Sequence, residues 1–130
     1  MKFRFVETDS RGNVEGYETL PLSWGNNIAL VLNEDADEVG VVSFNLHNKM
    51  LYIEYIYVNR RHRGSGVFKE MIIHLFRKYN EIETIEGCST ECAYEKWKGI
   101  GASIVCKELA KGLFDEGECA PFIIRKRDIL

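Results

Sequence analysis

Residues 58–68 read VNRRHRGSGVF and connect an apolar, strand-like run to an apolar, helix-like run. Four positive charges lie within residues 59–69, on Arg60, Arg61, Arg63 and Lys69, and no acidic residue accompanies them. The whole chain has a formal net charge of −3, so the remaining residues together carry −7 (−3 less the local +4). Nucleic-acid binding generally needs a broad basic surface, whereas charge confined to one turn favours a local site for a small polyanion.

The residues before this turn predict an antiparallel meander. Three runs are rich in β-branched and aromatic residues, IALVL at 28–32, VGVVSFNL at 39–46 and MLYIEYIYV at 50–58, and polar turns separate them. Such runs joined by short polar turns form neighbouring strands. A short alternating run at 2–7 precedes them. Residues 8–27 are expected to be irregular or hairpin-like, because they contain three glycines, a proline and an asparagine pair.

After the turn the period changes. From Val67 the apolar residues recur every three or four positions, which predicts a helix of about 13 residues. A short run at 82–87 predicts a strand, and ECAYEKWK at 91–98 predicts a second helix that Ser89 or Thr90 can cap. Residues 101–109 and 121–129 are expected to form two further strands around an acidic loop, which contains Asp115, Glu116 and Glu118.

This order of elements indicates an α+β (α/β) fold with a mixed, mostly antiparallel sheet flanked by helices. A chain of 130 residues that is 45% hydrophobic can bury one core, and no linker divides it, so residues 1–130 are expected to form a single domain. No apolar run approaches the length needed to span a bilayer, and no signal peptide is visible. The sequence therefore predicts a cytoplasmic protein without a membrane or nucleic-acid partner.

The four cysteines have spacings that fit neither metal knuckles nor a small disulfide scaffold. They are Cys88, Cys92, Cys106 and Cys119. Reduced structural thiols are expected. The three histidines have no neighbouring ligand pattern, so no metal site is expected.

The glycine turn can bind phosphate. A strand ending at Val58, a tight turn with Gly64 and Gly66, and a helix beginning near Val67 leave backbone N–H groups pointing outward. The alternative is a glycine turn with solvated arginines. A Walker loop and a dinucleotide fingerprint both fail on spacing, because no Gly-Lys-Ser/Thr follows Gly66 and Lys69 occupies the last glycine position of the fingerprint.

Two motifs resemble those of the GNAT superfamily of acetyl-CoA-dependent N-acetyltransferases. The family's strand, pyrophosphate loop and helix are written V-x-P-x-x-R-G-x-G-x-G, and Val58, Arg63, Gly64 and Gly66 stand at the matching offsets. The family's second signature, a short helix ending in an aromatic residue and then a Gly-Phe or Gly-Ala pair, is matched by AYEKWKGIGA at 93–102, through Ala93, Trp97, Gly101 and Ala102. The resemblance covers roughly residues 28–129.

The resemblance implies acetyl-CoA as co-substrate and assigns its contacts. The diphosphate would lie on Arg63, Gly64, Ser65, Gly66 and Val67, and the pantetheine arm on Tyr57, Val58 and Thr90. The strand that ends at Val58 is expected to carry a bulge and to splay from the next strand.

The resemblance also places a general base near Glu54. It is the only carboxylate in its strand, and burial beside Tyr52, Ile56 and Val58 would raise the pKa of its carboxyl. The alternative is a solvated glutamate at a strand edge. Trp97 stands where the family often has the tyrosine that protonates the departing thiolate, so Tyr94 or water is the candidate acid. Tyr94 can equally be a packing residue.

Three departures from the family pattern bear on the acceptor site. Phe68 replaces the last small residue of the loop, so its ring is expected to point away from the phosphates. Residues 8–27 replace two helices, which shortens the N-terminal helical region. The acidic loop between the last two strands is expected to favour cationic amines.

The sequence thus predicts an N-acyltransferase in which a primary amine of a small molecule or protein attacks acetyl-CoA directly. The alternative is a catalytically silent acyl-CoA-binding or protein-interaction module of the same fold. A homodimer is compatible with either function.

Overall fold

The computed structural model describes residues 4–7, 27–33, 35, 37–64 and 66–130. Most of the segment expected to be irregular, residues 8–27, and the candidate loop residue Ser65 lie outside the described residues. No helix in the described ranges is long and apolar enough to cross a membrane.

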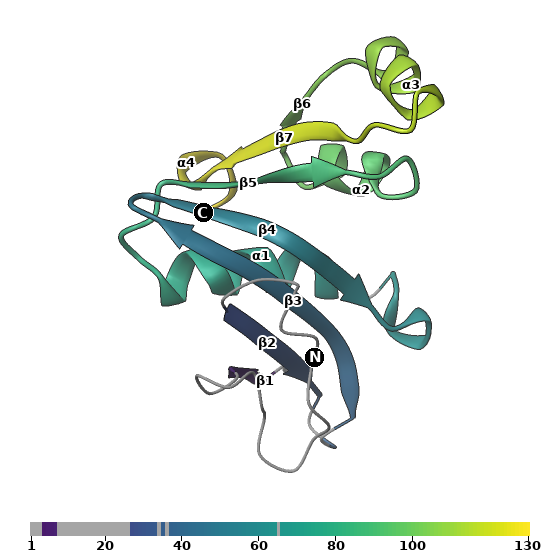
Figure 1. Cartoon of the computed structure of the whole chain (residues 1–130). Coiled ribbons are helices and arrows are strands. Elements are labelled where there is room, and N and C mark those ends of the chain that lie inside the picture. Colours follow the sequence, from purple (N-terminus) through teal and green to yellow (C-terminus); the bar gives the residue numbers. More distant parts are fainter. Residues whose placement is uncertain (1–3, 8–26, 34, 36, 65) are drawn as a thin grey trace.

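The described strands form one seven-stranded sheet in the order β1-β2-β3-β4-β5-β7-β6 (Figure 1). The antiparallel half contains β1 (Arg4–Glu7), β2 (Asn27–Leu32), β3 (Glu38–His47) and β4 (Met50–Val58). The second half contains β5 (Thr84–Ser89), β6 (Ser103–Ile104) and β7 (Ala120–Arg125), which are antiparallel to one another. Only β4 and β5 pair in parallel, so the predicted mixed, mostly antiparallel sheet is confirmed.

The parallel pairing of β4 with β5 is short. It joins Met50–Tyr52 to Thr84–Glu86 and then stops, and Figure 1 shows the two strands diverging beyond that point. On its other side β4 stays paired with β3 through Val58, but the register shifts between Ser43 and Phe44. Their partners are Tyr55 and Ile53, so Glu54 is the extra residue of a β-bulge. The expected bulge and splay are confirmed.

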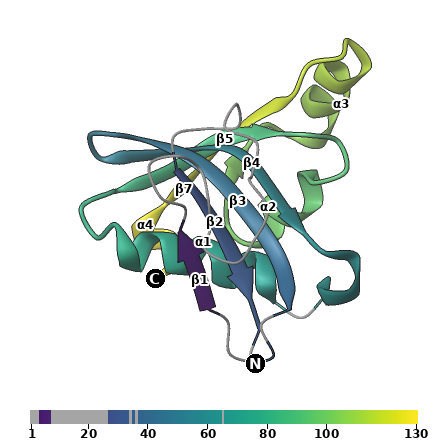
Figure 2. The same cartoon turned by 60° about the horizontal axis from the view of Figure 1, so that its bottom comes forward.

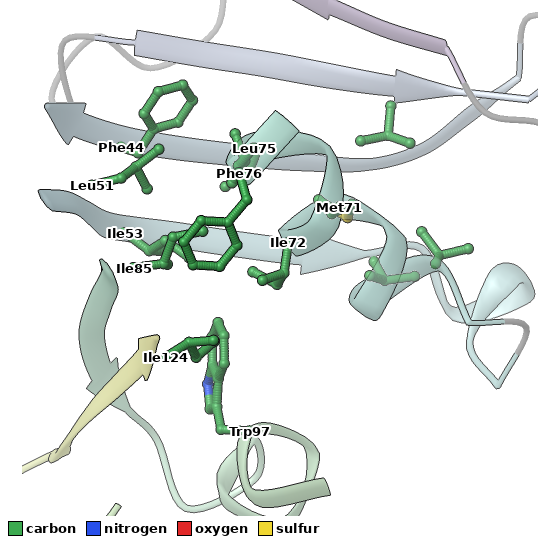
Figure 3. Packing of buried hydrophobic residues seen from close by; sticks show 14 of the residues in the cluster. Phe44, Leu51, Ile53, Met71, Ile72, Leu75, Phe76, Ile85, Trp97 and Ile124 are labelled. Carbon is green, nitrogen blue, oxygen red and sulfur yellow. The ribbon is translucent and has the colours of Figure 1, made fainter. Parts of the chain in front are cut away.

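Helix α1 (Val67–Lys78) covers one face of the sheet, as its apolar period predicted. Its buried side chains are Val67, Met71, Ile72, Leu75 and Phe76. Figure 3 shows Met71, Ile72, Leu75 and Phe76 facing inward-pointing residues of four strands, which are Phe44, Leu51, Ile53, Ile85 and Ile124. This core fixes which side chains of each strand point toward α1 and which point to the opposite face.

Helix α2 (Tyr94–Gly99) joins the same core through Trp97, which is 2% exposed. The indole stacks on Phe122 of β7 with ring centroids 3.9 Å apart. Phe68 of α1 packs against it edge-on at 4.6 Å, so the Phe68 ring is turned into the core cluster. These three aromatic rings hold α1, α2 and β7 together.

The prediction for residues 101–109 was wrong in part. Only Ser103–Ile104 form a strand, and a helix, α3 (Lys107–Asp115), replaces the expected strand end and part of the acidic loop. Ala110, Leu113 and Phe114 give this helix an apolar side that packs with Tyr94. Figure 2 shows α1 crossing behind the strands and α3 lying beyond the N-terminal end of β7.

The end of the chain and the acidic loop also differ from expectation. The last strand stops at Arg125, and residues 126–129 form a short helix, α4 (Lys126–Ile129). Asp115 is the last residue of α3, and its carboxylate pairs with Lys111 at 2.9 Å. That pairing reduces the negative charge this segment offers to an acceptor.

The prediction of four reduced thiols was wrong for two of them. Cys88 and Cys119 form a disulfide with their Cα atoms 5.5 Å apart, while Cys92 and Cys106 are free and exposed. The register of the sheet explains this pairing, because Cys88 lies opposite Pro121 and one residue from the Ser89–Ala120 pair. The disulfide therefore closes a loop that contains α2, β6 and α3.

Candidate active site

The turn between β4 and α1 presents an open backbone. A single 3₁₀ turn, η2 (Arg60–His62), follows Asn59, whose side-chain oxygen accepts from the Arg61 N–H at 3.3 Å. Gly64 and Gly66 then adopt φ values of 84° and 81°. Residues with a Cβ are disfavoured there by roughly 1 to 2 kcal/mol. Around either glycine the space that a Cβ would occupy has no atom within 4 Å, so the turn is open on that side.

Helix α1 begins at this open turn. Gly66 is its N-cap residue, and no side chain caps the first turn. The first backbone N–H groups of a helix have no partner within the helix. They are therefore available to a ligand at the turn.

A cleft of about 300 Å³ separates this turn from α2. One wall contains five residues of β4, the turn and α1 that the family resemblance assigned to acetyl-CoA: Val58, Arg63, Gly64, Gly66 and Val67. The other wall contains three residues of α2 and its C-cap residue: Glu95, Lys96, Gly99 and Ile100. Five of the eight predicted cofactor contacts thus line one cleft.

Arg63 is held in place by the end of β4. Its Nε donates to the carbonyl oxygen of Val58 at 3.0 Å, and its guanidinium carbon lies 5.5 Å from the centre of the Tyr57 ring. The two terminal nitrogens make no hydrogen bond with the described residues. Arg63 can therefore donate two further charge-assisted hydrogen bonds to an anion in the cleft.

Lys96 is a candidate site residue that the sequence reading missed. It is exposed on α2, lines the cleft opposite Arg63, and forms no ion pair within the described parts of the chain. The helical period around Trp97 could have indicated that Lys96 lies outside the core. Only the packing of α2 against α1 shows which residue it faces.

A family model described as acetyltransferase (GNAT) family matches residues 5–94. The chain belongs to this family. No curated protein shows a significant match to the chain.

Solved structures share the GNAT fold. A GNAT-family acetyltransferase of Staphylococcus aureus superposes with a TM-score of 0.56 at 16% identity, covering 76% of this chain and 66% of that one. Tetrahymena GCN5 gives 0.60 at 13% identity, covering 76% and 67%. The N-acetylglutamate synthase of Neisseria gonorrhoeae, solved with coenzyme A and N-acetyl-glutamate, gives 0.58 at 13%, covering 75% and 25%. The chain thus spans about two thirds or less of these proteins.

Glu54 lies on the face of β4 opposite α1. As the bulge residue it falls between Ile53, which packs in the core, and Tyr55. It is exposed, and its Oε1 accepts a hydrogen bond from Asn45 Nδ2 at 2.9 Å. The expected burial beside Ile56 and Val58 is wrong, because the bulge moves these two residues to the core face and leaves Glu54 on the opposite face. Asn45 orients the carboxylate instead.

Tyr94, the candidate acid, is not part of the cleft lining. It is 4% exposed, and its hydroxyl donates to the carbonyl oxygen of Val105 at 2.7 Å. Its ring packs edge-on against Phe114 of α3. The hydroxyl proton is therefore directed toward the β6–α3 connection rather than toward the glycine turn.

The two remaining predicted contacts among the described residues, Tyr57 and Thr90, do not line the cleft. Tyr57 is 44% exposed beneath the Arg63 guanidinium. Thr90 is exposed in the turn after β5, where its carbonyl oxygen accepts from Ser89 Oγ at 2.8 Å, and it does not line the cleft. Its hydroxyl is thus the least supported of the described candidates.

A second, larger hollow lies at the opposite end of the sheet. It measures about 560 Å³ and is basic, with Arg125, Lys126 and Arg127 beside Glu83 and Leu130. None of the predicted site residues lines it. It provides a competing location for a polyanion.

We expect Tyr94→Phe to destabilise the protein by about 1 kcal/mol, because Val105 loses a buried hydrogen-bond donor. Urea denaturation measures this change. Tyr52→Phe is the matched control, since the Tyr52 hydroxyl makes no hydrogen bond among the described residues. A stable Tyr94→Phe variant whose acyl transfer had collapsed would instead restore Tyr94 as the acid.

Proposed function

We propose that the protein is an N-acyltransferase that transfers an acetyl group from acetyl-CoA to a primary amine by direct attack. The observation that carries this proposal is the cleft that Arg63 and Lys96 both line beside the N-terminus of α1, whose N-cap is Gly66. It lies beside the splayed end of β4.

The diphosphate of the co-substrate would bind at the glycine turn. The N-terminus of α1 carries about half a positive charge and stabilises an anion by about 0.3 to 1 kcal/mol. Hydrogen bonds from a charged donor such as Arg63 contribute about 1.5 to 3 kcal/mol each. Gly64 and Gly66 present no side chain to the cleft, so phosphate oxygens can approach the backbone.

The pantetheine arm would lie along β4 beyond Tyr52. On that side of the strand the backbone from Ile53 to Val58 has no β5 partner. An extended chain with amide groups can pair with such an edge as an added strand would. Tyr57 and Val58 would then contact the arm, and an unpaired backbone N–H of this edge would polarise the thioester carbonyl.

Glu54 would take the proton from the attacking amine. An amine with a pKa of about 10.4 needs roughly 4.6 kcal/mol to be neutral at pH 7, so a base is required. Glu54 is exposed and held by Asn45, a position from which it can act through one bridging water. The amine nitrogen then bonds to the acyl carbon, the carbon–sulfur bond breaks, and the thiolate leaves.

Water would protonate the thiolate in this proposal. Tyr94 donates its proton to Val105, and Trp97 is enclosed between Phe68 and Phe122. A thiol has a pKa of about 8.5, so the released thiolate takes up a proton from solution at neutral pH, and water only has to relay that proton.

A catalytically silent acyl-CoA-binding module is the second candidate. The observation that favours it is Trp97, an aromatic core residue at the position where the family often has its acid. Acetyl-CoA binding without release of CoA across a panel of amines would support this candidate.

Charge-reversal variants should show whether acetyl-CoA binds in the cleft or at neighbouring basic residues. We expect acetyl-CoA to raise the melting temperature of the wild-type protein, and Arg63→Glu and Lys96→Glu each to weaken its binding at least about tenfold. Arg61→Glu and Lys98→Glu are matched controls on the same two elements, since neither residue lines the cleft. Equal losses in all four variants, measured by thermal shift, would contradict a site in the cleft.

Glu54→Gln should lower kcat by about 10² to 10⁴ while leaving acetyl-CoA binding intact, because the amide cannot accept the proton. CoA release, followed with a thiol reagent, measures this. Glu83→Gln is the control, because Glu83 pairs with Lys49 at the far end of the sheet. Full activity of Glu54→Gln would rule out this base.

A further inference from the structure

One row of side chains crosses the sheet on the face opposite α1. The ladder pairs Asn45 with Tyr52, Tyr52 with Glu86, Glu86 with Ile123, and Ile123 with Ser103. Directly opposed residues on neighbouring strands point to the same face. Their sequence neighbours Phe44, Leu51, Ile85, Phe122 and Ile124 belong to the core under α1, so this row faces the other way.

A groove of about 540 Å³ lies along this row. Its apolar lining includes Ile104, Val105, Pro121 and Ile123, and its polar lining includes Tyr52 and Glu86. No lysine, arginine or histidine lines it. The groove therefore offers an apolar wall and a single carboxylate.

The Glu86 carboxylate is half-buried and has no cationic partner among the described residues. Its Oε2 accepts from Thr84 Oγ1 at 3.0 Å, and no ion pair within the described ranges includes it. Arg125, opposite Thr84 in the ladder, donates instead to Ser103 Oγ at 3.2 Å. A partly desolvated carboxylate without a counter-charge is unfavourable, and a ligand cation would compensate it.

The cross-strand row links the groove to the proposed reaction site, although Asn45 and Glu54 do not themselves line the groove. Asn45 holds Glu54 and is the first member of the row that contains Glu86. Two strand spacings separate Asn45 from Glu86, which places their Cα atoms roughly 9 to 10 Å apart. A short alkyl chain can span this distance.

We propose that the acceptor is a linear diamine whose second ammonium group binds Glu86 in this groove. The inference rests on the proposed function and names its substrate class. The reacting amine lies near Glu54, the methylene chain packs along Ile123 and its apolar neighbours, and the distal ammonium pairs with Glu86 beside the Tyr52 ring. An amine without a second ammonium group loses the contact with Glu86.

Two probes of equal chain length test this inference, 1,6-diaminohexane and n-hexylamine. Calorimetry with and without saturating CoA should show the diamine binding at least about tenfold tighter to the wild-type protein. In Glu86→Gln the ratio of the two affinities should fall close to one. In Glu83→Gln, a matched change on an exposed carboxylate, the ratio should stay at the wild-type value.

A wild-type ratio near one, a ratio unaffected by Glu86→Gln, or no binding of either amine would overturn the inference. Tighter binding of a lysine peptide than of the diamine would overturn the choice of a small acceptor. Failure of the proposed function is distinguishable, because it appears as an absence of acetyl-CoA binding and of CoA release with n-hexylamine. The ratio of amine affinities is measured independently of both.

Discussion

The structure depends on how briefly β4 and β5 pair. Three residues of each strand form a parallel ladder, and β4 then continues alone on that side for six residues, from Ile53 to Val58. The bulge at Glu54 increases the local twist of β4 while its pairing with β3 continues. Trp97 and Phe122 stack on the core side, so α2 is packed firmly against β7 in the second half of the sheet. The divergence is therefore built into the core.

This divergence places two sites on opposite sides of one strand. At the end of β4 the chain enters the glycine turn, and the packing of Phe68 on Trp97 sets α2 across the cleft from it. On the sheet face opposite α1, Asn45 donates a hydrogen bond to Glu54 and belongs to the same cross-strand row as Glu86. The segregation of charge in the sequence has a counterpart in the structure, because Arg63 and Lys96 line the cleft, whereas Glu54 and Glu86 lie on the sheet face opposite α1.

The sequence predicted the elements whose pattern is local. Runs of β-branched and aromatic residues between polar turns identified β2, β3 and β4, and the three-to-four period identified α1 almost to its ends. Helix α3 was missed because residues 103–109 alternate like a strand and Gly112 interrupts the helical pattern. Its apolar side is recognisable only beside Tyr94 and Ala120.

The missed site features depend on long-range register. Lys96 faces Arg63 only through the packing of α2, and Glu86 neighbours Tyr52 only through the β4–β5 ladder. The Cys88–Cys119 disulfide depends on the β5–β7 register in the same way. The expected burial of Glu54 failed for the same reason, because the bulge moves Ile56 and Val58 to the core face and leaves Glu54 on the opposite face.

Amide chemical-shift mapping with coenzyme A tests the central claim most directly. The account predicts that the largest shifts fall on Gly64, Gly66, Val67 and Lys96, on the two walls of the cleft. Shifts concentrated instead around Arg125, Lys126 and Arg127, at the basic hollow on the opposite end of the sheet, or no shifts at all, would contradict it.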